Sequence, residues 1–480
     1  MKKSTSVILV LCLLLSSFGL LASCSGGGKS GGGANELTIM HFVGGFGDEW
    51  LKSAVKKFED AYPGTKVKLT ADNSLRTNAS VYLNSGKNIP DIMMSQTLGW
   101  SEFVQNGKVE SLEEVFEAEA KPGVTIKDFI IDDYSGYPYM KRSYNSQEER
   151  PWVIPWSVLS CGIAYNETIL LETTRASNGG KWTAPPATVP ELLEYCDDLN
   201  KAGKTPFAWA GSGINWLTFP QYVWWAQYQG VEGDNSWFNF WDFASADVYK
   251  QEGIAKSLDV LRSLLVKDGK WNNTIENPDG KVTTDAERSF VNGEAAMIMC
   301  GGWLENEMRD FTPKGFKMKM MPTPLIDGAK VNSATGKPYT INNANAGDVM
   351  FIPAEAKNKD LAKSFLKFIT TEEMMLEFTK LTGMMRPFKY DPIALDPSHT
   401  WSDFQKSSFD LYTKSDVNLF EYSKNKSDIY LFKRPELFQE VTVNTALNNL
   451  KTKTGAQIME DVYAKVSVEY PKWKSSLGIE

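Results

Sequence analysis

The sequence contains little histidine and cysteine, and this scarcity excludes several kinds of reactive site. Two of the 480 residues are histidine and five are cysteine. No two cysteines form a CxxC pair, so a cysteine-held zinc site or thioredoxin-like redox chemistry has no support. The zinc-peptidase motif HExxH is also absent. We therefore expect no bound metal ion and no cofactor.

Basic patches and long apolar runs are scarce as well. The formal net charge is −8 and the pI is near 5.2, with no run of basic residues, so we expect no nucleic-acid partner. Beyond the N-terminal segment, no apolar run reaches the roughly 20 residues that a membrane-spanning helix needs. Hydrophobic residues still make up 42% of the chain, which is typical of folded proteins. The length favours two or three domains.

The N-terminal segment is typical of an exported protein. Two lysines precede the apolar run Val7–Leu15, which is too short to span a bilayer. The segment ends in Leu21–Cys24, LASC, which resembles the bacterial lipobox with Cys24 as the acylated first residue of the mature chain. The following stretch is rich in glycine and serine and is typical of a flexible tether.

We expect residues 1–23 to be a lipoprotein signal peptide and 24–35 to be the tether. The mature protein would then be held at the cell membrane by its lipid alone, on the extracytoplasmic side. The sequence leaves open whether this is a Gram-positive surface or a periplasm. An ordinary secretory signal with a chance cysteine is the alternative.

The other cysteines of the mature chain are Cys161, Cys196 and Cys300, an odd number at wide spacing. We expect them to be buried as small hydrophobic residues. One disulfide with one free thiol is the alternative.

Hydrophobic periodicity predicts alternating strands and helices in the folded part. A strand at 37–42, a helix from Asp48, a strand at 65–71, a helix at 75–85 and a strand at 91–94 indicate a parallel sheet covered on both faces. Ligands bind beyond the carboxyl ends of such strands, so we expect the loops 44–48 and 95–100 to face a cleft. Later predicted elements are strands at 161–166, 295–300 and 349–352 and helices at 190–201, 254–267 and 360–370.

The segment Phe290–Met297, followed by Gly301, Gly302 and Trp303, carries a resemblance to a known family. It resembles the signature F-x-x-G-x-A-A-M … G-x-W of family 1 extracellular solute-binding proteins, the maltose-binding type. Three other stretches agree with this family in type and order: Ile89–Ile92 with Gly107 and Leu112, Ile163–Asn166 with Leu170, and Ile352-Pro353 leading into 360–366 and 371–373.

The resemblance implies an α/β fold of the type II periplasmic-binding-protein kind. Two lobes, each a mainly parallel sheet flanked by helices, would be joined by a hinge that the chain crosses more than once. We expect 36–150 plus 325–374 in lobe one and 151–324 plus 375–480 in lobe two. By resemblance the protein captures a carbohydrate, which we expect to be an oligosaccharide, and delivers it to membrane permease subunits of an ABC transporter. We expect a monomer that is not an enzyme.

A sugar presents C–H faces that lie on aromatic rings and hydroxyl groups that need hydrogen-bond partners. By resemblance, Trp303 stacks on the sugar, and Gly302 lets the backbone approach it. Trp216, on a glycine-rich loop, is a second aromatic candidate, whereas the tryptophans at 224–225 and 237–241 favour core packing. Glu305 is a candidate with a solvated charge as the alternative, and Arg386 is one with an ordinary surface ion pair as the alternative. The remaining candidates are Asp348, Phe46, Gln96 and Trp156.

Two other functions remain open at this level. A glycosidase needs only two carboxylates, so abundant acidic residues do not exclude one, although no spacing nominates a pair. A surface lipoprotein that holds polysaccharide without an importer is the second alternative.

Changing Cys24 to Ala tests the lipid anchor. Without the thiol no lipid can be attached, so we expect the protein to leave the membrane fraction for the soluble one. Fractionation of salt-washed membranes measures this. Membrane association that survives the change would contradict the anchor.

Overall fold

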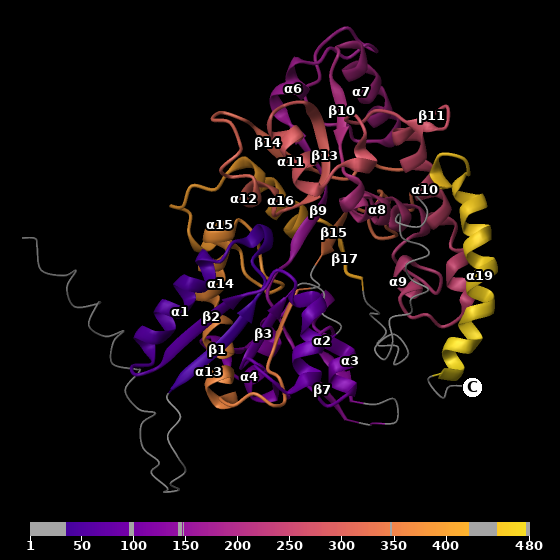
Figure 1. Ribbon diagram of the computed structural model, residues 1–480. Coiled ribbons are helices and arrows are strands. Elements are labelled where there is room, and N and C mark those ends of the chain that lie inside the picture. The colour runs from indigo at the N-terminus through magenta and orange to yellow at the C-terminus, as the bar shows by residue number, and fades with distance from the viewer. Residues whose placement is uncertain are drawn as a thin grey trace, which may run out of the picture.

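The computed structural model describes residues 35–95, 100–142, 146, 148–345, 348–421 and 449–476. The signal peptide, nearly all of the tether, Cys24 and Gln96 lie outside these residues. The described chain forms two lobes, each built on its own central sheet (Figure 1). The two-lobed α/β fold expected from the sequence is confirmed.

Lobe one is built on a five-stranded sheet with the order β2-β1-β3-β16-β8. β1 pairs in parallel with both β2 and β3, while β16 is antiparallel to its neighbours β3 and β8. The sheet therefore has a single reversed strand and is mainly parallel, as expected. Its strands are β1 (Glu36–His41), β2 (Lys66–Ala71), β3 (Ile92–Ser95), β8 (Ile154–Pro155) and β16 (Val349–Phe351).

Helices cover both faces of this sheet because its side chains alternate between two apolar cores. On β3, Ile92 and Met94 join one core and Met93 joins the other. On the first face lie α1 (Glu49–Ala61), α13 (Lys359–Ile369) and α14 (Glu372–Thr382), and on the second α2 (Leu75–Ser85) and α3 (Trp100–Gln105). α2 has the predicted bounds and ends at Gly86, whose φ of 65° suits glycine.

Lobe two is built on a six-stranded sheet in which only β9 is reversed. β9 pairs antiparallel with β13, β14 and β15, and parallel pairs join β10 to β13 and β15 to β17. The strands are β9 (Leu159–Asn166), β10 (Thr205–Ala208), β13 (Ala295–Gly301), β14 (Met318–Met321), β15 (Ile341–Asn345) and β17 (Val417–Leu419).

An aromatic core fills one side of the lobe-two sheet. As expected, the tryptophans at 224–225, Trp237 and Trp241 are fully buried in it. The helices on this side are α7 (Val189–Lys201), α8 (Thr218–Gln229), α9 (Trp237–Phe240), α10 (Glu252–Leu265) and α19 (Gly455–Ser476); α11 (Thr283–Val291), α12 (Leu304–Glu307) and α16 (Asp403–Lys414) cover the other side. Cys161, Cys196 and Cys300 are buried and free.

Shorter elements complete the described chain. They are η1 (Gly44–Phe46), α4 (Glu113–Phe116), β4 (Glu119–Lys121), β5 (Val124–Thr125), α5 (Ile126–Phe129), η2 (Asp132–Tyr134), β6 (Tyr139–Lys141), β7 (Glu149–Pro151), α6 (Glu167–Glu172), η3 (Gly211–Leu217), η4 (Ala246–Lys250), β11 (Val266–Lys267), β12 (Lys270–Trp271), η5 (Pro278–Gly280) and α15 (Pro392–Leu395).

The strand partners indicate later lobe boundaries than those expected from the sequence. β8 still belongs to the first sheet and β15 still belongs to the second, so the chain crosses between β8 and β9 and again between β15 and β16. α14 packs on α1 and α13 of lobe one, and α16 packs on β14 and β9 of lobe two. We propose that the third crossing lies between α15 and α16, rather than at residue 375.

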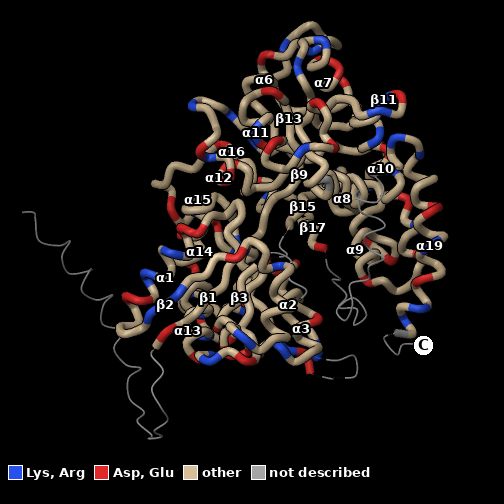
Figure 2. The backbone as a smooth tube through the Cα atoms, viewed as in Figure 1, with Lys and Arg blue, Asp and Glu red and all other residues tan. Residues whose placement is uncertain are grey.

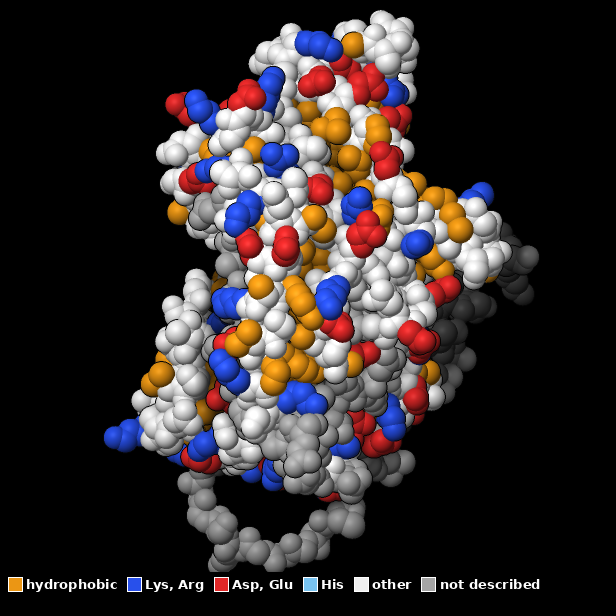
Figure 3. All heavy atoms as spheres, turned by 90° about the vertical axis from the view of Figure 1, so that its right-hand side faces the viewer, with side chains coloured by type: hydrophobic (Ala, Val, Ile, Leu, Met, Phe, Trp, Pro, Cys, Tyr) orange, Lys and Arg blue, Asp and Glu red, His pale blue; other side chains and the backbone are white. Residues whose placement is uncertain are grey.

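Residues of both charges are interspersed along the backbone of both lobes (Figure 2). The face shown in Figure 3 carries such charges among uncharged atoms, with hydrophobic side chains gathered along its middle. Within the described ranges, no helix is long and apolar enough to cross a membrane.

Candidate functional site

The two lobes contact each other where the loop after β1 meets α12. Asn306, on α12, donates a hydrogen bond from Nδ2 to the carbonyl oxygen of Gly45, at 2.6 Å. Gly45 lies so close to α12 that an added Cβ would be 2.9 Å from Oε2 of Glu307. The contact therefore joins the carboxyl end of a lobe-one strand, where α/β sheets bind ligands, to lobe two.

Trp303 lies at the start of α12, directly after β13, and is half-buried. Its indole Nε1 donates to Oε1 of Glu287 at 3.3 Å. Its ring centroid is 5.3 Å from that of Trp216 and 5.8 Å from that of Phe219, in edge-to-face arrangements. Two aromatic neighbours thus orient an indole that still has exposed surface, which suits it to an apolar ligand face.

Gly301 leaves room for the Trp303 ring. An added Cβ at Gly301 would lie 2.1 Å from Cζ3 of Trp303 and 2.8 Å from Sγ of Cys161. Gly302 is different, because the nearest atoms to its added Cβ would be at 3.9 Å, an ordinary contact. Its amide donates to the carbonyl oxygen of Ser160 at 3.0 Å. Gly302 therefore helps to hold the strand end, and Gly301 is the residue that must be small.

Two carboxyl groups lie beside Trp303. Glu287, on α11, is fully buried, and Glu307, on α12, is half-buried. Burial, followed by repulsion from Glu307, raises the pKa of Glu287 to about 8. Burial also raises the pKa of Glu307. Neighbouring carboxyl groups that are poorly hydrated resist being ionised together, so this pair favours keeping a proton at neutral pH.

A groove between the lobes lies next to α12 and has a volume of about 610 Å³. Lobe one contributes Glu49 and residues 380–383, and lobe two contributes residues of α12, the segment 312–318 and residues 400–405. Acidic and basic side chains are balanced in this lining: Glu49, Glu305 and Asp403 against Arg309, Lys317 and Lys380. Such a mixed lining suits a neutral polar ligand better than a strongly charged one.

Glu305 is the predicted site residue that lines this groove. Its Oε2 accepts a hydrogen bond from Oγ of Ser402 at 2.8 Å, and burial raises its pKa. It is available to accept further hydrogen bonds from a ligand. Within the described part of the chain, no group of three or more histidine, cysteine, aspartate or glutamate residues is arranged to hold a metal ion.

The sequence from residue 45 to residue 376 matches the family model described as bacterial extracellular solute-binding protein. The chain belongs to this family. It is thereby classed as a solute-binding protein and not as an enzyme.

Known proteins resemble the chain along most of its length. The arabinooligosaccharide-binding protein of Bacillus subtilis is 22% identical over 440 residues, which are 90% of this chain and 87% of that protein. A structure solved for xylan utilization by the thermophilic bacterium Caldanaerobius polysaccharolyticus has a TM-score of 0.67 at 15% identity, covering 90% of this chain and all of the other. A solute-binding protein in complex with raffinose has a TM-score of 0.61 at 18% identity, with 90% and 99% covered.

Two aromatic residues expected in the cleft of this solute-binding protein lie in the core of lobe one instead. Trp156 is fully buried, its ring stacked at 5.6 Å on Trp50, and Phe46 packs against it at 4.5 Å. The sequence placed both on cleft loops, but the short 3-10 helix turns Phe46 inward. Both are packing residues in this structure, which corrects their assignment as ligand contacts.

Arg386 and Asp348 are buried at the hinge and not in the groove. The Arg386 guanidinium donates to the carbonyl oxygens of Ile369 and Pro155, and burial lowers its pKa to about 10. Oδ2 of Asp348 accepts from Oγ of Ser157 at 2.5 Å, and burial raises the pKa of Asp348 to about 7. Their assignment as ligand contacts is therefore corrected: Asp348 joins two crossing segments, and Arg386 ties the segment after α14 to Ile369 and Pro155.

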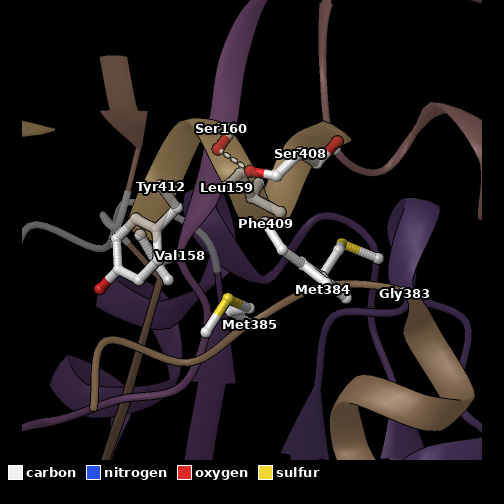
Figure 4. A pocket seen from close by; sticks show the side chains of 10 residues that line it. Val158, Leu159, Ser160, Gly383, Met384, Met385, Ser408, Phe409 and Tyr412 are labelled. Carbon is white, nitrogen blue, oxygen red and sulfur yellow. Dashed lines mark hydrogen bonds between the residues drawn. The ribbon is translucent and has the colours of Figure 1, made fainter. Parts of the chain in front are cut away.

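Next to these residues, the hinge has a narrow apolar pocket (Figure 4). Ser160, on β9, donates from Oγ to the carbonyl oxygen of Ser408 on α16, at 2.8 Å. The side chains of Met384 and Met385 lie below this bond, on the segment that follows α14. Flexible methionine side chains can adapt as packed segments shift, as a hinge requires.

Trp216 is another predicted site residue, and its ring contacts that of Trp303. Gln96 lies outside the described residues. The sequence missed Phe219, Asn306 and Glu287. Of these three, only Glu287 could have been selected from the sequence. It lies on the face of α11 that also carries Ala286 and Phe290, both of which are apolar. A carboxylate on an apolar helix face indicates a buried interaction.

Changing Gly301 to Ala tests how Trp303 is held. The added methyl group would overlap the indole, so we expect the ring to move and the free energy of unfolding to fall by about 1–3 kcal/mol. The indole N–H resonance of Trp303 in an ¹⁵N-tryptophan-labelled protein and the melting temperature measure the two effects. Gly302→Ala is the matched control and should leave the resonance in place. Equal effects of the two changes would contradict this role of Gly301.

Proposed function

We propose that this protein is the substrate-binding lipoprotein of an ABC importer and that its ligand is an oligosaccharide. The groove between the lobes is the observation that carries this proposal. Its volume of about 610 Å³ lies within the roughly 300–1,000 Å³ of ligand pockets, which leaves room for a short oligosaccharide. Its polar, balanced lining supports a neutral, hydroxyl-rich ligand.

The residues divide the binding between two kinds of contact. The exposed part of Trp303 stacks on a sugar ring, and Glu305 and Asn306 at the adjacent groove accept and donate hydrogen bonds to hydroxyl groups. The names of relatives support a carbohydrate, since one is an arabinooligosaccharide-binding protein and another was solved with raffinose. A lipid on Cys24 keeps the protein beside the permease subunits that receive the sugar.

Closure of the lobes is the proposed mechanism. A ligand in a groove with one wall from each lobe contacts both of them and so favours the closed arrangement. The contact between Asn306 and Gly45 exists only when the lobes are together, so it adds to the closed state. Closure needs no change to the sugar, which agrees with the family's non-enzymatic character.

A thermal-shift panel of arabino-, xylo- and chito-oligosaccharides, with raffinose and maltose, tests the function. A ligand at 100 times its dissociation constant should add about 2.7 kcal/mol to the free energy of unfolding. With the best ligand, we expect Trp303→Ala to weaken binding by at least about tenfold, or 1.4 kcal/mol, in calorimetry. Trp271→Ala, a half-buried tryptophan of lobe two away from the groove, is the control. A panel in which no sugar stabilises the protein would argue against the proposal.

Small-angle scattering tests closure. We expect the radius of gyration to fall when the best sugar is added, because the lobes then swing together. The same concentration of a sugar that gives no thermal shift is the control, and the ligand should be recovered intact after overnight incubation. Tight binding with no change in radius would contradict the hinge.

A further inference from the structure

Asn306 makes a hydrogen bond that joins the two lobes, and a second bond within lobe two decides which way its side chain faces. Nδ2 of Asn306 donates to the carbonyl oxygen of Gly45, at 2.6 Å. On its other side, Oδ1 of Asn306 accepts a hydrogen bond from Nη2 of Arg309. The amide therefore bridges a guanidinium of its own lobe and a backbone carbonyl of the other lobe.

These two partners allow the Asn306 amide only one orientation. A guanidinium has only N–H donors and a carbonyl oxygen can only accept, so an amide turned by 180° would lose both bonds. A hydrogen bond from a charged donor is also stronger than one between neutral groups. Without Arg309 the side chain of Asn306 could turn away toward water. Arg309 thus keeps the donor atom of Asn306 directed at lobe one.

Gly45 permits the close approach of the two lobes. Its neighbours Gly44 and Gly47 have φ values of 46° and 66°, which favour glycine, whereas Gly45 has no positive φ. Alanine at position 45 would therefore cause no such strain within lobe one. Its Cβ would nevertheless lie 2.9 Å from Oε2 of Glu307 and 3.1 Å from Cβ of Trp303, both in lobe two. The Glu307 side chain can turn aside, but Cβ of Trp303 is fixed to the backbone.

We propose that Arg309 is a positioning residue for closure of the lobes: it orients Asn306 to donate to Gly45, and this bond slows the opening that releases the ligand. The inference rests on the proposed function in taking closure as the way the sugar is held. The bond to Gly45 must break before the lobes part, so it slows release and has little effect on the first encounter with the sugar.

Arg309 also lines the groove, so a direct contact with the sugar is the competing explanation. The two roles differ in their dependence on Asn306. An arginine that acts through Asn306 has no further effect once that amide is removed. An arginine that contacts the sugar keeps its effect when Asn306 is absent. A double-mutant cycle separates the two, because only the first role makes the substitutions non-additive.

The separation of the lobes can be measured without any sugar. Lys56→Cys in lobe one and Glu294→Cys in lobe two place nitroxide labels at exposed positions, and the native cysteines of the described chain are buried. In double electron–electron resonance, we expect the shorter separation to lose population in Asn306→Asp. This isosteric change still accepts a hydrogen bond from Arg309, but it has no N–H to donate to Gly45.

Two further variants act on the partners of Asn306. Gly45→Ala should also shift the labels toward the longer separation, because its methyl group meets lobe two only when the lobes are together. Arg309→Lys keeps a charged donor and should retain more of the shorter separation than Arg309→Met does. Lys314→Met, at an exposed lysine of lobe two that does not line the groove, is the matched control and should leave the separation unchanged.

Release of the best sugar, followed by stopped-flow fluorescence, provides the second readout. We expect Arg309→Met to raise the dissociation rate by about three- to tenfold, the range for one lost hydrogen bond, with the association rate nearly unchanged. Asn306→Ala should raise the dissociation rate at least as much. The variant with both changes should release the sugar no faster than Asn306→Ala alone.

Two outcomes would overturn the proposal. One is a label separation in Asn306→Asp that equals that of the wild type. The other is a cycle in which Arg309→Met and Asn306→Ala add, which would assign Arg309 to direct sugar contact. If no sugar binds the wild type, the proposed function fails, and the label separations still decide whether Asn306 holds the lobes together.

Discussion

The burial of polar groups at the crossings between the lobes is the constraint on which the rest of the structure depends. Asp348, at the crossing into β16, accepts a hydrogen bond from Ser157, at the crossing into β9. Arg386, on the segment after α14, donates to carbonyl oxygens beside it. Charged groups out of water need such partners, so the crossing segments are fixed relative to one another.

The candidate site is rigid on one side and movable on the other. Within lobe two, Trp303 is held by Trp216, Phe219 and Glu287, all of which remain in place if the lobes part. Gly45, by contrast, belongs to lobe one, and its contact with Asn306 would break if the lobes parted as proposed. Under the proposed closure mechanism, a ligand would meet a prepared aromatic surface first and gain the second wall afterwards. Preorganising one half of a site reduces the entropy lost on binding.

Sequence patterns predicted those features that are determined by residues near one another in the chain. The bounds of α2 were predicted because a glycine with positive φ ends it, and Trp303 was selected as a candidate because the glycines before it form part of a motif. Phe46 and Arg386 were misplaced because a turn or loop does not reveal which way its side chains point. Their burial depends on α14 and on strands distant in sequence, which no local pattern contains.

The lobe boundaries likewise depend on pairs of strands that are distant in sequence, and β16 shows the consequence for the chain during synthesis. Val349–Phe351 sits between β3 and β8, although both of these strands are complete by residue 155. The first sheet therefore cannot close until nearly two hundred further residues have been synthesised. Until then β3 presents an unpaired edge, which other chains could join. Because the first sheet is completed late, the chain stays unfolded for longer. This suits a polypeptide that must pass unfolded through a narrow export channel.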